Sequence, residues 1–383
     1  MKIVHITPIY WDNWGYQENY LAKIQAELGQ DVTVICPNVA LSSYKTVKLD
    51  GKYDYFFSGF RVVRLHLLFN LLNRFYIYKN LQQTLKDINP DIIMIHGLAC
   101  LPSIQVVRYK KKNPNVTLYA DFHADALISA NNFISKFVLH KFIWKLVIKI
   151  VIKHFNKIYY TRPSVKRFSM DMYSLQENKL HELLLGAEKK VTNADKIKIS
   201  RLKLRSKLNL QEDDILICTG GKIDHFKKID FLISAIENMK IRSKLHLVIF
   251  GSVSLDYMNE YKQNIKRINN VHELGWMNED DIEDVYHASD IAIFLGNHSV
   301  LWEKAICCGI PTIFSEEVDR TYLDLNGNNI FVKNNDIGDL TENLLNLVNN
   351  PEKIQLMRSI AEKEGLKKFS YSNIFRNLTE SWK

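Results

Sequence analysis

The chain has 383 residues, too many for one ordinary core and suited to two domains of roughly 150–200 residues each. With 46% apolar and 24% charged residues, the composition is that of a soluble globular protein. Lys and Arg (51) outnumber Asp and Glu (42), and the net charge of +9 suits a polyanion, a phosphate-bearing ligand or an anionic membrane without choosing among them.

The N-terminal stretch MKIVHITPIYWDNWG reads as a short strand and a turn, too short and too polar for a signal peptide. No segment offers about 20 uncharged apolar residues, so no membrane span is predicted. The five cysteines show no CxxC pair and no metal-ligand spacing. We therefore expect a cytoplasmic protein with reduced thiols.

In the first half of the chain, short apolar runs alternate with helical patterns, which predicts a parallel sheet covered by helices. The runs are continuously apolar, as in strands that are buried on both faces. The expected strands are 2–7, 31–36, 61–66, 91–97 and 116–123, and the expected helices include 19–28, 74–88 and 103–111.

The second half repeats this plan after a charged stretch that lacks a strand pattern. Its expected strands are 215–221, 245–251, 271–275, 291–296 and 311–315, with helices that include 229–239, 255–268, 282–288, 300–308 and 340–348. We therefore predict two doubly wound α/β domains, 1–185 and 206–365, joined by a linker at 186–205. Ligands of such sheets bind beyond the carboxyl ends of the strands.

The stretch CTGGKIDHFKKID follows one expected strand and leads into a helix. Gly220 and Gly221 allow a tight turn, and Lys222 and Lys228 project near a helix N-terminus, where backbone NH groups favour an anion. This favours a diphosphate-binding loop, and a solvated basic loop is the alternative. GxxxxGK[ST] is absent, and no GxGxxG follows the first strand, which counts against a dehydrogenase.

Glu303 stands in the otherwise apolar or small run GNHSVLWEKAICCGIPTI. Gly296 and the Asn-His-Ser turn after it place the expected helix start near His298 or Ser299, with Glu303 one turn further on. A carboxylate there can accept hydrogen bonds from two hydroxyls, such as the 2′- and 3′-hydroxyls of a ribose. Pairing with a nearby Lys or Arg is the other interpretation.

These segments resemble the GT-B glycosyltransferases of the family 4 (glycosyltransferase group 1) type. GGK with a second lysine is similar to the basic pair that binds the donor diphosphate there, and WEKAICCGIPTI resembles the segment whose glutamate holds the donor ribose. PIYWDNWGYQENYLAKIQAELGQDVTVI, DIIMIHG, LLLGAE and VHELGWMNEDDIEDVYHASDIAIF resemble further landmarks in the same order. The resemblance implies two Rossmann-like domains facing across a cleft, with a last helix, 366–383, crossing back to the first domain.

The resemblance, together with the positions of residues after the expected strands, implies roles for individual residues. The expected catalytic residues are His123, which ends the run YADFH, and Lys222 and Lys228. The expected donor-binding residues are Gly15, Gly221, Lys222, Lys228, Trp276, Gly296, His298, Ser299 and Glu303. The expected acceptor-side residues are Tyr16, Gln17 and Glu18 in the loop that begins at Trp14, and His96. For His123, His96 and Trp276, a structural role is the alternative, and Glu18 could instead merely start the following helix.

One departure from the family concerns a first glutamate, which is usually separated from the second by seven intervening residues. That position is Leu295, which cannot handle the transferred sugar. We hypothesise that His298 and the backbone of its turn take over that part.

The expected activity is a retaining transfer of a sugar from a UDP- or GDP-linked donor to a glycan or lipid-linked acceptor in cell-surface polysaccharide synthesis. No metal or other cofactor is expected, because no Asp-x-Asp pair ends a strand and Glu279–Asp281 read as a helix turn capped by Asn278. A nucleotide-sugar epimerase and a non-enzymatic nucleotide-binding module are the alternatives. Nucleic acid is not an expected partner, since no motif for it is present.

The stretch Ser135–Phe155 carries Lys141, Lys145, Lys149 and Lys153 four positions apart, beside an apolar face that includes Phe142 and Trp144. Such a helix suits an anionic membrane surface, which favours a peripheral location on the inner face of the plasma membrane. A helix packed into the first domain, with its lysines solvated, is the alternative.

Overall fold

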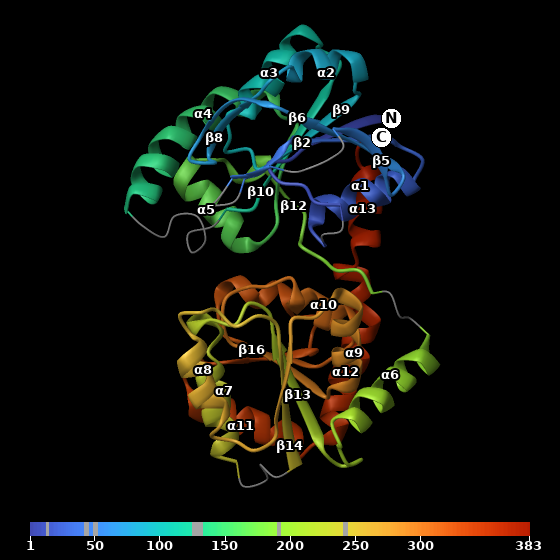
Figure 1. The fold of residues 1–383 in the computed structure, drawn as a ribbon, viewed down its shortest axis with the longest axis vertical. Coiled ribbons are helices and arrows are strands. Elements are labelled where there is room, and N and C mark those ends of the chain that lie inside the picture. The colour runs from blue at the N-terminus through green and yellow to red at the C-terminus, as the bar shows by residue number, and fades with distance from the viewer. Residues whose placement is uncertain (13–14, 42–45, 49–52, 125–132, 190–192, 240–243) are drawn as a thin grey trace. The chain divides into compact units, whose positions relative to one another are not determined.

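The chain folds into two compact units. The computed structural model describes residues 1–12, 15–41, 46–48, 53–124, 133–189, 193–239 and 244–383. The first unit comprises Met1–Leu185 together with Ile374–Lys383, and the second comprises Gly186–Asn373. Each unit has a mainly parallel sheet flanked by helices and its own apolar core (Figure 1). This is the α/β architecture that the alternating runs predict.

The first unit contains an eight-stranded sheet in the order β12-β11-β10-β9-β1-β2-β6-β5, in which only β5 runs antiparallel to its neighbour. Its strands are β1 Lys2–Ile6, β2 Asp31–Pro37, β5 Asp54–Phe57, β6 Phe60–Leu65, β9 Ile92–His96, β10 Thr117–Phe122, β11 Lys157–Tyr160 and β12 Leu180–Glu182. Two hairpins stand apart from this sheet: β3 Val39–Leu41 with β4 Thr46–Lys48, and β7 Leu67–Leu71 with β8 Phe75–Tyr78.

The helices of the first unit follow most of the expected positions. They are α1 Gln17–Glu27, α2 Leu81–Ile88, α3 Pro102–Lys112, the π-helix Ile134–Trp144, α4 Lys145–Val151, the 3-10 turn Ile152–His154, α5 Pro163–Tyr173 and the 3-10 turn Glu177–Lys179. The helix α13 Tyr371–Glu380 leads into the last residues of this unit.

The prediction of a helix over 74–88 is wrong for the first part of this range. Residues 75–78 form β8, whose side chains alternate between half-buried and buried, and the helix begins only at Leu81. Leu72 and Asn73 both have positive φ and close the β7–β8 hairpin, a turn geometry that matches the twist of two antiparallel strands. The aromatic residues Phe75, Tyr76 and Tyr78 favour this strand.

The second unit contains a six-stranded parallel sheet in the order β15-β14-β13-β16-β17-β18. Its strands are β13 Ile215–Gly220, β14 Leu245–Phe250, β15 Val271–Gly275, β16 Ile291–Phe294, β17 Thr312–Ser315 and β18 Asn329–Val332. Its helices are α6 Ala194–Lys207, α7 Ile229–Glu237, α8 Met258–Ile265, α9 Glu279–Ala288, α10 Leu301–Cys307, α11 Ile337–Val348 and α12 Pro351–Phe369, with 3-10 turns at His225–Lys227 and Val318–Leu323.

Two local features of the second unit bear on the sequence interpretation. Asn278 accepts hydrogen bonds from the backbone NH groups of Asp280 and Asp281, so the acidic turn is the capped start of α9, as predicted. Helix α6 occupies most of the range expected as a linker, and Arg201 on it donates to Asp290 at 2.7 Å. Helix α6 is therefore fixed to the second unit by a specific ion pair.

The C-terminal residues of the chain are held in the first unit by Trp382. Its indole stacks on Tyr119 with ring centroids 4.7 Å apart, and its Nε1 donates to the hydroxyl of Tyr159 at 3.0 Å. Only 7% of Trp382 is exposed. Tyr119 and Tyr159 lie on neighbouring strands, β10 and β11. The last residues therefore cover the part of the first sheet that β10 and β11 form.

We expect Trp382→Ala to destabilise the protein by about 3 kcal/mol, because a buried aromatic ring and the hydrogen bond that satisfies Tyr159 are both lost. The measurement is the midpoint of thermal or urea unfolding. Trp276→Ala is the matched control, since Trp276 is 76% exposed and should change stability by no more than about 0.5 kcal/mol. Equal effects of the two changes would contradict the anchoring role.

Candidate functional site

Three loops of the second unit meet beyond the carboxyl ends of β13, β14 and β16, and glycines bring their backbones into contact. A Cβ built on Gly251 would lie 1.8 Å from the carbonyl oxygen of Gly221, and one on Gly296 would lie 1.9 Å from the carbonyl oxygen of Phe226. No side chain fits at either position. Gly221 and Gly251 also have φ of +116° and +117°, which other residues rarely adopt.

A cavity of about 470 Å³ opens between these loops, beside the start of α9. Its lining includes Gly221, Lys222, Ser252, Ser254 and Trp276. Three predicted donor-site residues, Gly221, Lys222 and Trp276, are therefore brought together. Trp276 is 76% exposed, which excludes the core role that was its alternative and leaves its ring free to cover a flat ligand.

The two lysines that end this loop point to different partners. Lys228 is in the left-handed region, with φ of 54°, and its Nζ donates to the side chains of Asn334 and Asn335. Lys227 donates to the carbonyl oxygen of Asn297 at 3.0 Å, and its Nζ is 3.7 Å from the position of a Cβ on Gly221. The lysine beside the glycine turn is thus Lys227, which the sequence interpretation passed over in favour of Lys228.

Burial, with a contribution from the nearby Arg320, lowers the pKa of both Lys227 and Lys228. A cation in a partly desolvated position gains more from an anionic ligand than one in bulk water does. Asp224 fixes the local geometry, because its carboxylate accepts from the backbone NH of Phe226 at 3.0 Å and holds the 3-10 turn.

Glu303 is fully buried in α10, with one oxygen bound and the other unsatisfied. Its Oε1 accepts from the hydroxyl of Tyr322 at 2.6 Å and from Nε2 of His298 at 2.9 Å. Its Oε2 has no hydrogen-bond partner within the described residues. The adjacent Lys304 is 2.5 Å from Glu283 and does not neutralise Glu303. The alternative of a Lys or Arg partner is therefore not what the structure shows.

The turn before α10 differs in detail from the expectation. The helix begins at Leu301, not at His298 or Ser299, because the backbone of residues 296–299 remains irregular. His298 packs edge-on against the Trp302 ring and is directed at Glu303. Leu295 is buried in the core of the unit. Hence His298 positions the buried carboxylate.

Arg320 fixes the same turn from the following segment. Its guanidinium donates to the carbonyl oxygens of Gly296 at 2.9 Å and Ser315 at 3.0 Å, and it lies 4.9 Å from the centre of the Trp302 ring. Arg320 and Tyr322 were not singled out from the sequence. They lie on a short 3-10 segment with no motif, so no sequence signal marks them.

In the first unit, a hydrogen-bonded chain of polar side chains runs through the sheet where β1, β9 and β10 end. Asp121, which is 1% exposed, accepts from Nδ1 of His96 at 2.6 Å and from the backbone NH of Gly97 at 2.8 Å. Nε2 of His96 lies 3.1 Å from Nδ1 of His5, and His5 Nε2 donates to Gln25 at 2.7 Å. Burial and the neighbouring His96 lower the pKa of His5 to about 3.

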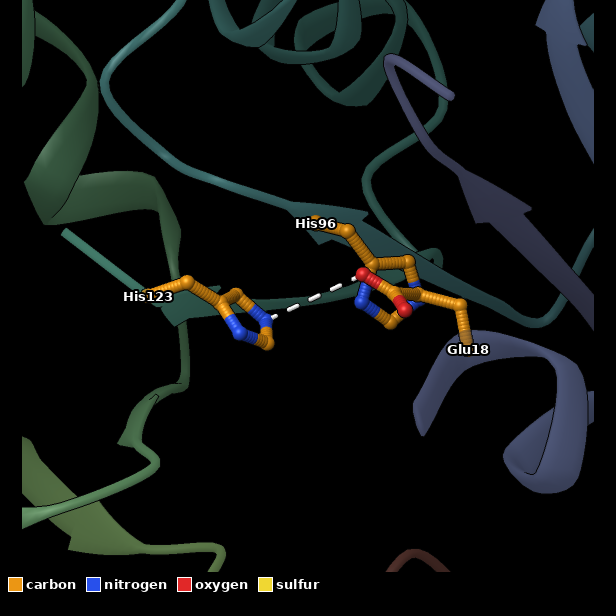
Figure 2. A group of neighbouring side chains, drawn as sticks. All are labelled: Glu18, His96 and His123. Atoms are coloured by element: carbon orange, nitrogen blue, oxygen red, sulfur yellow. Dashed lines mark ion pairs between the residues drawn. The ribbon is translucent and has the colours of Figure 1, made fainter. Parts of the chain in front are cut away.

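His123 lies at the open end of this chain, facing Glu18 (Figure 2). Its Nε2 is 3.3 Å from Asp121 and 3.9 Å from Glu18. Burial alone would lower the pKa of His123, but the charge of Asp121 and the weaker charge of Glu18 outweigh it and raise that pKa to about 9. The nearby Arg162 opposes this rise. His123 is therefore an imidazolium at neutral pH and can donate to a ligand oxygen.

The other predicted acceptor-side residues surround the start of α1. Gln17 is 4% exposed, and both atoms of its amide lack a partner in the described parts of the chain. Tyr16 and Gly15 are exposed, and Trp14 lies outside the described residues. The Gln17 amide therefore keeps its capacity to bind a polar group, whereas both ring nitrogens of His96 already face side chains inside the sheet.

The atoms of Glu18, His96 and His123 that could bind a metal lie within 4.8 Å of one another. Both ring nitrogens of His96 already face His5 and Asp121, so a cation would have to displace one of those contacts. The cluster is better matched to proton-sharing among its own members than to a metal. Metal independence remains a prediction.

Comparison with known proteins identifies the second unit. Residues 200–364 match the family described as glycosyl transferases group 1. The second unit is a group 1 glycosyltransferase domain. A glycosyltransferase of Methanocaldococcus jannaschii whose function is uncharacterised is 24% identical over 119 residues, and this match spans 30% of each of the two chains.

Solved structures resemble the whole chain. HepE of Anabaena, in complex with UDP, has a TM-score of 0.74 at 15% identity and covers 100% of this chain and 99% of its own. Sucrose-phosphate synthase of Thermosynechococcus elongatus has a TM-score of 0.72 at 13% identity, covering 100% and 98%. WaaG, a glycosyltransferase of lipopolysaccharide biosynthesis, has 0.66 at 13%, covering 98% of each. At such identities the likeness is one of fold.

The predicted group 1 resemblance and GT-B fold class are thus confirmed, and the enzyme class is supported at the level of this glycosyltransferase domain. Assignment to family 4 remains a prediction. No helix among the described residues is long and apolar enough to cross a membrane.

In the first unit, Asp121 and His5 were not among the site residues predicted from the sequence. A signal for Asp121 exists, because residues two apart on a strand share a face and Asp121 precedes His123 by two.

We expect Asp121→Asn to lower the pKa of His123, measured as the midpoint of its ring signals in an NMR titration. Because the pKa of His123 is higher in the folded protein than the unfolded value near 6.5, its protonation stabilises the fold fully below that value. This stabilisation is lost as the pH rises towards about 9. The free energy of unfolding of Asp121→Asn should therefore lack this pH dependence. Glu18→Gln should give a smaller decrease, because Glu18 lies farther from His123. An unchanged titration midpoint of His123 in both variants would show that these carboxylates do not raise its pKa.

Proposed function

We propose that the protein is a retaining, metal-independent glycosyltransferase. It moves a sugar from a UDP- or GDP-linked donor to a glycan or lipid-linked acceptor in cell-surface polysaccharide synthesis. The observation that carries the proposal is the buried Glu303, with one oxygen fixed by Tyr322 and His298 and the other unsatisfied. A buried carboxylate oxygen without a partner is costly unless a ligand supplies the donor.

The donor is assigned to the loops of the second unit. Glu303 accepts from the ribose hydroxyls, and the base lies in the cavity beside Trp276. The diphosphate binds the basic loop through Lys222 and Lys227, with Lys228 as the alternative to Lys227. In support, HepE has been solved with UDP and with UDP-glucose, although that chain shares only 15% identity with this one.

In the reaction, the bond between the anomeric carbon and the diphosphate oxygen breaks, and the acceptor oxygen bonds to that carbon. The acceptor proton leaves on the departing diphosphate. Fixed cations stabilise the leaving group most effectively where water is excluded, and the lysines serve that purpose here. The first unit supplies His123 as a donor to a sugar hydroxyl, and Glu18 and Gln17 as partners of the acceptor.

The acceptor and location remain proposals as well. WaaG, which has a similar fold, acts in lipopolysaccharide biosynthesis. A polysaccharide intermediate on a lipid carrier would be reached from the inner face of the plasma membrane.

A thermal-shift panel of UDP, GDP, ADP and CMP tests the donor site. We expect one nucleoside diphosphate to stabilise the protein, with the same shift in EDTA. Glu303→Gln should weaken this binding about tenfold or more, because a hydrogen bond to a charged group is worth about 1.5–3 kcal/mol.

Glu342→Gln is the matched control, since Glu342 is exposed on α11. If no nucleotide shifts the melting temperature of wild type, the donor site is wrongly assigned. A shift that EDTA abolishes and magnesium restores would refute metal independence.

Replacing each lysine by methionine separates the two candidates for the diphosphate. We expect Lys227→Met to weaken UDP binding about tenfold, because the Lys227 Nζ lies beside the glycine turn. Lys228→Met should have a smaller effect, because two side chains, those of Asn334 and Asn335, hold its Nζ. The Lys227 Nζ has one partner among the described residues, the carbonyl oxygen of Asn297. Calorimetry with UDP measures the difference. With uridine both variants should bind as wild type does. A larger loss of UDP affinity in Lys228→Met than in Lys227→Met would support Lys228, the residue predicted from the sequence, as the diphosphate ligand.

A further inference from the structure

The exposed apolar side chains of the described residues are concentrated on two elements of the first unit. Of the 20 large apolar residues that are exposed, six lie in or beside the helical segment 133–154 and four on the β7–β8 hairpin, so ten lie there. Isolated exposed apolar residues need no explanation, but a concentration of this kind marks an interaction surface.

The helical segment is apolar on two sides. Leu139, Trp144, Val147, Ile148 and Val151 are buried in the core of the first unit, so the alternative of a packed helix is correct for this side. The opposite side exposes Phe133, Phe137, Val138, Phe142, Leu146 and Ile150, between 41% and 72% each. Packing therefore does not account for these six residues.

Lysines run alongside that exposed apolar stripe. Lys136, Lys141, Lys149 and Lys153 are exposed and Lys145 is half-buried. Lys136 and Lys141 both place their Nζ 5.6 Å from the centre of the Phe137 ring. Long lysine side chains beside apolar residues can reach lipid phosphates while the apolar residues enter the acyl region.

The β7–β8 hairpin adds a second apolar projection. Leu68, Phe69, Leu71 and Leu72 are 70%, 45%, 50% and 76% exposed. Leu72 adopts a φ of +56° at the tip, where glycine or asparagine would be less strained. The exposed Leu72 side chain does not stabilise the fold by burial, and its backbone is strained, so folding alone does not explain a leucine here. This points to a role in binding.

The two elements adjoin. Phe75 of β8 stacks on Trp144 with ring centroids 5.1 Å apart, and Figure 1 shows β8 beside α4. At the other end of the helical segment, Lys110 and Lys111 of α3 lie close enough to His154 to help lower its pKa, after burial. The hairpin, the helical segment and the start of the basic region on α3 are thus neighbours within the first unit.

The positive charge of this region indicates which kind of partner it binds. No Asp or Glu occurs in residues 59–86, 92–120 or 126–170, which include both elements and α3. A two-fold contact with a second copy would bring lysine stripes against each other, which opposes self-association. An anionic bilayer satisfies both the lysines and the apolar residues.

We propose that the hairpin tip and the exposed side of segment 133–154 form one membrane-docking surface, which binds the surface of an anionic lipid bilayer. The hairpin is the part that the sequence did not indicate. Docking is peripheral: the apolar residues enter the interface from one side, and the lysines contact the headgroups.

The test is sedimentation of the full chain with vesicles of phosphatidylcholine alone or of an equal mixture of phosphatidylcholine and phosphatidylglycerol. We expect binding to the anionic vesicles only. Phe142→Gln, Leu72→Asn and the double variant Lys141→Gln/Lys149→Gln should each reduce the partition coefficient about tenfold or more. Leu72→Asn suits the positive φ, so loss of folding is not an issue for it.

Leu255→Asn is the matched apolar control, because Leu255 is 93% exposed in the second unit, and Lys262→Gln/Lys266→Gln controls for the loss of two exposed lysines. Both controls should bind as wild type does. Absence of binding to anionic vesicles, or equal losses in test and control variants, would overturn the proposal. So would a wild-type dimer that Phe142→Gln converts to a monomer without affecting vesicle binding. No donor or acceptor is present, so the result is independent of the proposed reaction.

Discussion

The contact between the backbones of Gly221 and Gly251 is the constraint on which the glycosyltransferase domain depends. With no side chain between them, the loops after β13 and β14 approach so closely that the Gly221 carbonyl occupies the place of a Cβ. Gly296 makes the equivalent approach to the Phe226–Lys227 backbone from the loop after β16. This packing opens the cavity beside Trp276 and carries Lys227 to the glycine turn.

The two units solve the problem of buried charge in different ways. In the second unit, Glu303 has neutral or weakly basic neighbours and retains an oxygen for a ligand. In the first unit, Asp121 is surrounded by donors, which hold the pKa of its carboxyl well below its usual range although burial alone would raise it. The first arrangement leaves binding capacity, and the second fixes the protonation of His123.

Local patterns predicted most of the fold because the strands are buried on both faces and their apolar runs are unbroken. Strands of three or four residues, such as β12 and β18, are too short to show a clear apolar pattern. The same holds for β8, where the sequence predicts a helix. In the site, Glu303 was recognised because a carboxylate in an apolar run is unusual. Tyr322 could not be, since its contact with Glu303 spans 19 positions and follows no periodicity.

The binding site of Trp382 has a consequence for synthesis on the ribosome. Residues 374–383 belong to the first unit but are made after the whole of the second. Until they emerge, Tyr119 and Tyr159 lack the indole that covers them, and this part of the sheet stays open to water. The first unit therefore completes its folding only after the second unit has been synthesised, and a chain that lacks residues 374–383 leaves Tyr119 and Tyr159 without this contact.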